Sequence, residues 1–120
     1  MSDHAEASPD SKAICDRLFG GLSSRILNLR RVESQRWCGV YQDGRRRFAY
    51  VNHRKGMSRI EIWCLGEPEE LQKRTGLTIN PRNPTTGGFG AAFSSHFFVD
   101  GFADADAACD VLFAVSFRLS

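Results

Sequence analysis

The side chains best suited to chemistry in this sequence are arginines and aromatic rings that gather around one predicted turn. Ten basic residues lie between Arg25 and Arg59, against only Glu33 and Asp43 on the acidic side. The planar guanidinium group of arginine fits phosphate and carboxylate oxygens, and aromatic rings can stack on the bases of single-stranded nucleic acid. The sequence therefore predicts contact with nucleic acid or another polyanion through Arg45, Arg46, Arg47, Arg36, Arg54, Lys55, Trp37 and Tyr50.

A β-hairpin is predicted to position these residues. Residues 36–51 form two alternating segments joined by Asp43 and Gly44, a pair typical of two-residue type I′ turns. A two-residue turn gives three facing pairs on one side of the hairpin: Trp37 with Tyr50, Gly39 with Phe48, and Tyr41 with Arg46. The other side carries small aliphatic residues flanked by arginines: Cys38, Val40, Ala49 and Val51, with Arg36, Arg45 and Arg47.

Two interpretations of this hairpin stay open. If helices cover the aliphatic side, the aromatic side is left as a stacking platform. If the aromatic rings form the core instead, Gly39 makes room for Phe48 and the arginines form a solvated rim. The turns that carry Arg45 and Arg54 are expected at opposite ends of the sheet, so a basic patch would run along the sheet.

A second candidate site is the segment 80–92, which is rich in proline, asparagine, threonine and glycine. Its composition predicts a long loop and the most mobile internal segment of the chain. Its glycines lack the lysine, the preceding strand and the following helix of a nucleotide site. Phe89 and Arg82 are the residues we single out for contact with a ligand or partner. An enzyme or small-ligand site between the sheet and this loop is the alternative to polyanion binding.

No pattern in the sequence predicts a metal, a cofactor or a catalytic set. The three histidines and four cysteines show neither zinc-finger spacing nor an H-E-x-x-H motif. Glu61 is followed by Ile62 and Trp63, so the lysine of a restriction-type nuclease strand is missing. A cysteine nucleophile assisted by His53 or His96 stays open, without a recognisable context. We therefore expect no cofactor, name no catalytic residue, and favour a non-catalytic protein.

Periodicity and capping signals predict the remaining elements. An N-terminal helix capped by Ser8 would carry an apolar stripe as far as Arg30, and Gly20 and Gly21 would kink or divide it. Further on we expect a strand over 58–65, a short helix over 67–76 and a strand over 95–99. Asp104 is expected to cap the final helix.

The 120 residues suit one domain, which we place at 8–120 after a flexible tail at 1–7. The four scattered cysteines indicate reduced core residues and a cytoplasmic location, and no apolar run is long enough for a membrane helix. The pattern of elements predicts a two-layer α+β domain, with an antiparallel sheet of four or more strands and the N-terminal and C-terminal helices packed on it.

The order of these elements resembles a small bacterial domain family of unknown function. The resemblance extends from Ile14 to Leu119 and is carried by the strand sequence RFAYV at 47–51, the strands at 60–62 and 96–99, and the closing helix entered over 104–110. Members of that family occur alone or appended to predicted restriction-type proteins. The resemblance implies a bacterial accessory domain and supplies no catalytic residues.

Three functional hypotheses follow. The leading one is a non-catalytic binding module that contacts nucleic acid or another polyanion through the basic hairpin. The second is the enzyme or small-ligand protein described above. The third is a protein-interaction adaptor or a homodimer that pairs through an exposed strand edge.

Overall fold

The structure, a computed structural model, describes residues 10–33, 37–53, 59–81 and 93–118. The predicted tail, the cap Ser8 and most of the 80–92 loop lie outside these ranges. Within them the helices and strands follow in the order α2 (Ser11–Arg25), β1 (Leu29–Glu33), β2 (Trp37–Gln42), β3 (Arg47–His53), β4 (Ile60–Cys64), α3 (Pro68–Gln72), β5 (Asn80–Pro81), β6 (Ser95–Val99) and α4 (Phe102–Arg118).

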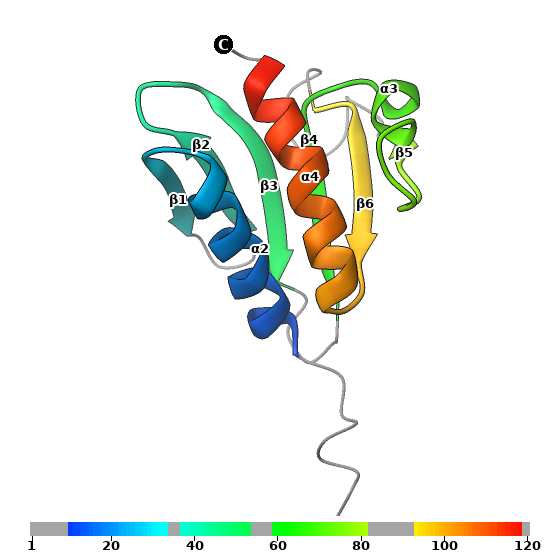
Figure 1. The fold of residues 1–120 in the computed structure, drawn as a ribbon, viewed down its shortest axis with the longest axis horizontal. Helices are drawn as coiled ribbons and strands as arrows, with labels where there is room; N and C mark the ends of the chain where they lie inside the picture. The colour runs from blue at the N-terminus through cyan, green and yellow to red at the C-terminus, as the bar shows by residue number, and fades with distance from the viewer. Residues whose placement is uncertain (1–9, 34–36, 54–58, 82–92, 119–120) are drawn as a thin grey trace, which may run out of the picture.

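The described strands form one sheet in the order β1-β2-β3-β4-β6-β5, and every neighbouring pair is antiparallel. Helices α2 and α4 lie side by side over one face of this sheet and pack against each other (Figure 1). The predicted two-layer α+β fold is therefore confirmed, with both the N-terminal and the C-terminal helix packed on an antiparallel sheet. We call the face under the helices the inner face and the opposite one the outer face.

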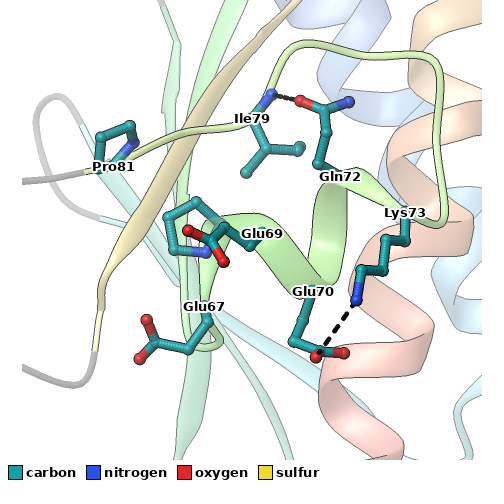
Figure 2. A pocket seen from close by; sticks show the side chains of 8 residues that line it. Glu67, Glu69, Glu70, Gln72, Lys73, Ile79 and Pro81 are labelled. Atoms are coloured by element: carbon teal, nitrogen blue, oxygen red, sulfur yellow. Dashed lines mark hydrogen bonds and ion pairs between the residues drawn. The ribbon is translucent and has the colours of Figure 1, made fainter.

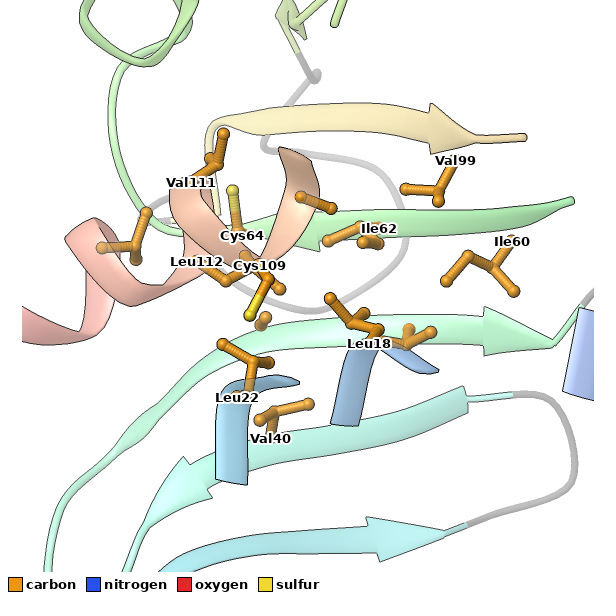
Figure 3. Packing of buried hydrophobic residues seen from close by; sticks show 14 of the residues in the cluster. Leu18, Leu22, Val40, Ile60, Ile62, Cys64, Val99, Cys109, Val111 and Leu112 are labelled. Atoms are coloured by element: carbon orange, nitrogen blue, oxygen red, sulfur yellow. The ribbon is translucent and has the colours of Figure 1, made fainter. Parts of the chain in front are cut away.

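Aliphatic side chains, together with Phe48 and Phe97, fill the space between the helices and the inner face. Leu18 and Leu22 of α2 and Leu112 of α4 point toward the strands (Figure 3). Burial of these side chains removes apolar surface from water, which is the main favourable contribution to folding. The inner-face residues of the four central strands are fully buried: Cys38, Val40, Ala49, Val51, Ile60, Ile62, Cys64, Ser95, Phe97 and Val99.

Helix α2 begins where its first turn is capped, since the Asp10 carboxylate accepts a hydrogen bond of 2.8 Å from Ala13 N. The predicted break at Gly20 and Gly21 is wrong, because α2 continues through both residues. A β-carbon added at Gly21 would lie 2.9 Å from Cys109 Sγ on α4, whereas one at Gly20 would meet no atom within 4 Å. Gly21 therefore allows the two helices to approach closely.

The N-terminal helix ends earlier than predicted, at Arg25, and the segment predicted as its last turns forms strand β1. The extended backbone of the C-cap residue Ile26 ends the helix, and Asn28, with a left-handed φ of 59° that asparagine tolerates, lies in the turn that leads into β1. Leu27, which the apolar stripe placed in the interior, is 78% exposed. Strand β1 was hidden from sequence analysis because four of its five residues are exposed on the edge of the sheet.

The predicted hairpin exists, but its register is wrong. Four residues rather than two connect β2 to β3, and only Gly44 of this connection has a positive φ, so the turn is not of type I′. A bulge between Val40 and Tyr41 then shifts the pairing by one residue. The observed pairs are Trp37 with Asn52, Gly39 with Tyr50, and Tyr41 with Arg47.

The two later helices also differ from their predicted limits. Helix α3 stops at Gln72, whose side chain holds the chain that follows. Its Nε2 donates to Leu77 O at 2.6 Å, and its Oε1 accepts from Ile79 N at 2.8 Å. Helix α4 starts at Phe102, two residues before the predicted cap. Asp104 lies in its first turn and accepts a bond from Asp100 N at 3.1 Å. The strand predicted over 95–99 is confirmed.

Candidate functional site

The outer face of the sheet is the candidate site, because polar and aromatic side chains gather there. Backbone alternation directs these residues away from the helices, and most of them are partly or largely exposed, in contrast to the buried inner face. The outer-face residues are Trp37, Gly39, Tyr41, Arg47, Tyr50, Asn52, Glu61, Trp63, His96 and Phe98, of which only Gly39 and Asn52 are buried.

Strand register arranges these residues in two neighbouring rows across four strands. Because facing residues of an antiparallel pair project on the same side, each row can be followed from β2 to β6. The first row is Trp37, Asn52, Glu61 and Phe98. The second row is Gly39, Tyr50, Trp63 and His96. The outer face is thus a mainly aromatic surface with one carboxylate among the rings.

Aromatic contacts join the two rows. The ring centroids of Trp37 and Trp63 are 4.6 Å apart with the planes tilted by 48°. Phe93, just before β6, packs on Tyr50 at 5.1 Å and is only 8% exposed. The Phe93 side chain therefore covers part of the aromatic surface at Tyr50.

The bulge places an arginine among these rings. Arg47 donates a hydrogen bond of 3.2 Å from Nη1 to Tyr50 Oη, and its guanidinium carbon lies 5.8 Å from the centre of that ring. This hydrogen bond raises the pKa of the Arg47 guanidinium above its usual value. A β-carbon at Gly39 would lie 3.2 Å from Arg47 Cδ and 3.4 Å from Tyr50 Cε1. Gly39 therefore makes room for Arg47 and Tyr50, and not for Phe48 as predicted.

Arg46 and Arg47 both lie in positions other than those predicted for them. Arg47 was expected beside the aliphatic side chains, yet it shares the outer face with Tyr50. Arg46 was expected opposite Tyr41, yet it is exposed in the connection between β2 and β3, together with Arg45. The physical reason is the bulge, since a slip of one residue moves a side chain to the other face.

The remaining predicted site residues have different outcomes. Trp37 and Tyr50 both lie on the outer face, in different rows. The structure brings Trp37, Tyr50 and Arg47 to one surface and leaves Arg45 and Arg46 at its end. Outside the described residues lie Arg36, Arg54, Lys55, Arg82 and Phe89.

Much of the basic charge that was noted in the sequence is balanced by aspartates. Across α2 and α4, Arg17 pairs with Asp106 at 2.9 Å and Arg25 pairs with Asp110. The Arg17 hydrogen bond lowers the pKa of the Asp106 carboxyl. Three further arginines face aspartates, in the pairs Arg30 with Asp43, Arg31 with Asp16, and Arg59 with Asp100. Among the described residues, Arg46 and Arg47 at the start of β3 form no such pair with an aspartate, so they are well placed to meet a polyanion.

Sequence analysis missed a polar cluster on the outer face. Trp63 Nε1 donates a hydrogen bond of 3.0 Å to Glu61 Oε2, and His96 Nδ1 lies 3.9 Å from the same oxygen. Glu61 and Trp63 share a face because they are two residues apart in a strand, and this signal was readable. His96 joins them only because β6 pairs with β4, which no local pattern reveals.

A cysteine nucleophile is contradicted at the strand nearest His96. Cys64 lies on the inner face, fully buried, and burial raises the pKa of its thiol to about 12. Burial likewise raises the pKa of Cys15 to about 12 and of Cys38 to about 11. Because the thiolate is the reactive form, burial of these thiols argues against their use as nucleophiles. All four cysteines are free and buried, as predicted.

A surface groove of about 790 Å³ lies beside α3, near where the 80–92 site was predicted. Ile79 and two prolines form its apolar part, and Glu67, Glu69 and Glu70 surround it with exposed carboxylates (Figure 2). One of these acids is paired with Lys73 at 3.9 Å. This acidic groove would repel a polyanion, so a nucleic acid would have to bind elsewhere.

Neither the described residues nor known proteins point to a metal, a membrane span or a relative. In the described part of the chain, no three residues among His, Cys, Asp and Glu gather as metal ligands would. No helix in those ranges is long and apolar enough to cross a membrane. Neither a family model, nor a curated protein, nor a solved structure matches this chain. The resemblance to a small bacterial family therefore stays a prediction.

Proposed function

We propose that this protein is a non-catalytic module that binds single-stranded nucleic acid on the outer face of its sheet. The observation that carries the proposal is the position of the aromatic rings. Trp37, Tyr50, Trp63 and Phe98 lie opposite the helices and stay partly exposed, whereas Phe48 and Phe97 are buried in the core. This arrangement meets the condition under which the aromatic side serves as a stacking platform.

The rings favour a single strand over a duplex. Stacking of a base on a protein ring requires an unpaired base, and each such contact contributes about 1–3 kcal/mol. Trp37 of β2 and Trp63 of β4 contact each other on this face, so a base of one strand would find both rings, whereas Tyr50 is partly covered by Phe93 and Arg47. Paired bases in a duplex present only their edges, which these rings cannot use.

The arginines at the start of β3 would meet the phosphates. Arg47 already lies across the Tyr50 ring, beside the position of a stacked base. Arg45 and Arg46 extend this positive charge along the connection from β2. Because phosphate contacts release bound cations, binding should weaken steeply as salt concentration rises.

A direct test is the anisotropy of a short labelled single strand, titrated with the protein at low and high salt. We expect Trp37→Ala to weaken binding by an amount that corresponds to about 1–3 kcal/mol. Phe117→Ala is the matched control, because it removes an exposed ring from α4 on the helix side. Melting curves of both variants show whether a loss reflects unfolding. Equal losses in both variants, or no binding by the wild type, would contradict the proposal.

A second candidate function is the binding of a small molecule on the same face. It is favoured by Phe93, which covers Tyr50, and by the carboxylate and imidazole that lie among the rings. Such a ligand would be bound without a strong salt dependence, because few phosphates would be involved. The change in affinity between low and high salt therefore distinguishes the two functions.

A further inference from the structure

The imidazole of His96 has one buried nitrogen and one nitrogen on the exposed side of its ring. Nδ1 is buried and has no hydrogen-bond partner among the described residues. The side chain as a whole is nevertheless 25% exposed. Its exposed part is therefore the side of the ring that carries Nε2.

The surroundings of Nδ1 determine which nitrogen holds the proton of the neutral ring. The Glu61 carboxylate lies beside it, with Oε2 at 3.9 Å from Nδ1 and bonded to Trp63 Nε1 at 3.0 Å. This carboxylate side chain is only 15% exposed, so its field is weakly screened. A proton on Nδ1 is attracted to the carboxylate, whereas a lone pair there would be repelled. The neutral ring therefore carries its proton on Nδ1 and an acceptor lone pair on Nε2.

His96 lies next to Trp63 in its row, so its acceptor nitrogen lies beside a ring on which a base could stack. His96 faces Trp63 across the β4 and β6 pair, and the ring of Phe98 meets it edge-on at 6.2 Å. A base stacked on Trp63 would present its edge to His96. The outer face would then offer a directional polar contact beside a stacking surface.

We propose that His96 Nε2 accepts a hydrogen bond from the exocyclic amino group of a stacked base, so that the protein prefers cytosine over uracil. The inference rests on the proposed function, because it requires a base on the outer face. Cytosine carries an amino donor at the position where uracil carries a carbonyl acceptor. Uracil would set its acceptor against the lone pair of Nε2, with the Glu61 carboxylate behind it.

The test compares two oligonucleotides of equal length, oligo-dC and oligo-dU, at slightly alkaline pH. These bases have rings of similar size, so stacking is matched and the amino group is the main difference. We expect the wild type to bind oligo-dC about tenfold more tightly, the effect of one hydrogen bond made to a satisfied acceptor. His96→Phe keeps a planar ring and removes both nitrogens. This variant should bind both oligomers equally, within twofold of the wild-type affinity for oligo-dU.

Glu61→Gln is the second variant, and it keeps the imidazole in place. The neutral amide holds the Nδ1 proton less strongly, so the preference for oligo-dC should fall while binding of oligo-dU is unchanged. Equal binding of both oligomers by the wild type would overturn the inference and leave the proposed function intact. Absence of binding to either would overturn both. A preference that persists in His96→Phe would also overturn it, because another residue would then read the base.

Discussion

The two faces of the sheet are built from the same strands and differ in almost every physical property. Inner-face residues of β2, β3, β4 and β6 are aliphatic or small in the main and fully buried under α2 and α4. Outer-face residues of the same strands are mostly aromatic or charged and are partly exposed. Residues of the inner face therefore serve stability, and rings left without a helix above them need another explanation. The comparison locates the candidate function on the outer face.

The largest expected effect comes from the inner face. Ile62 is fully buried in β4, next to the outer-face residue Trp63. Ile62→Ala should lower the free energy of unfolding by about 2–5 kcal/mol, because it removes buried methyl groups and leaves a cavity. The fraction that is folded should bind nucleic acid as the wild type does. Chemical denaturation and binding below the melting temperature check both points, and a loss of affinity in folded protein would break the division between the faces.

The helix pair that covers the inner face offers a matched test at two adjacent glycines. Gly21→Ala should destabilise the protein by about 1–3 kcal/mol, because the new methyl group meets Cys109 Sγ. Gly20→Ala should stabilise it by about 0.5–1 kcal/mol, because alanine favours the helix and this site is open. Thermal melting distinguishes the two signs. Cys109→Ala should restore part of the stability that Gly21→Ala loses, and a failure to do so would contradict close packing at this point.

Inner-face thiols should make the fold sensitive to alkali. Burial raises the pKa of Cys64 from 9.0 to about 12, so the folded state keeps its proton while the unfolded chain loses it. The stability contributed by the neutral thiol is complete below pH 9 and is lost as pH rises toward about 12, at about 1.4 kcal/mol per pH unit. Cys64→Ala should reduce this slope by that amount in denaturation curves. An unchanged slope would mean that the thiol is not protected.

The smallest expected effects distinguish the two neighbouring arginines at the start of β3. Arg47→Ala should weaken nucleic-acid binding, flatten its salt dependence by about 0.7 units for a lost phosphate contact, and disturb Tyr50. Arg46→Ala should change the salt dependence to a similar extent and leave the melting temperature unchanged, because that side chain is exposed. The reverse result, with Arg46 affecting stability, would support the register predicted from sequence.

Sequence analysis recovered the elements whose residues alternate between a buried and an exposed face. The strand at 95–99, the hairpin and the strand at 60–64 all follow this pattern. Strand β1 escaped because an edge strand with exposed, charged residues shows no alternation. The bulge at Val40 was not predicted, because a slip of one residue in the pairing leaves the amino-acid composition of both strands unchanged.

The candidate site was recovered in part for similar reasons. Trp37 and Tyr50 were found because local spacing places them on the aromatic side of the hairpin. His96 was not predicted as part of the site, because its contact with Glu61 depends on the pairing of two strands that are distant in sequence. The balance of basic residues by aspartates of α4 and of the β6–α4 junction was hidden for the same reason.

The central claim is that single-stranded nucleic acid stacks on the outer face, and tryptophan fluorescence tests it most directly. Both tryptophans of the chain lie on that face, 4.6 Å apart, so their emission reports on it alone. The account predicts strong quenching when an unlabelled single strand is added at low salt, reversal of the quenching at high salt, and a much weaker response to a blunt duplex. Unchanged emission at saturating single strand, or equal quenching by the duplex, would contradict it.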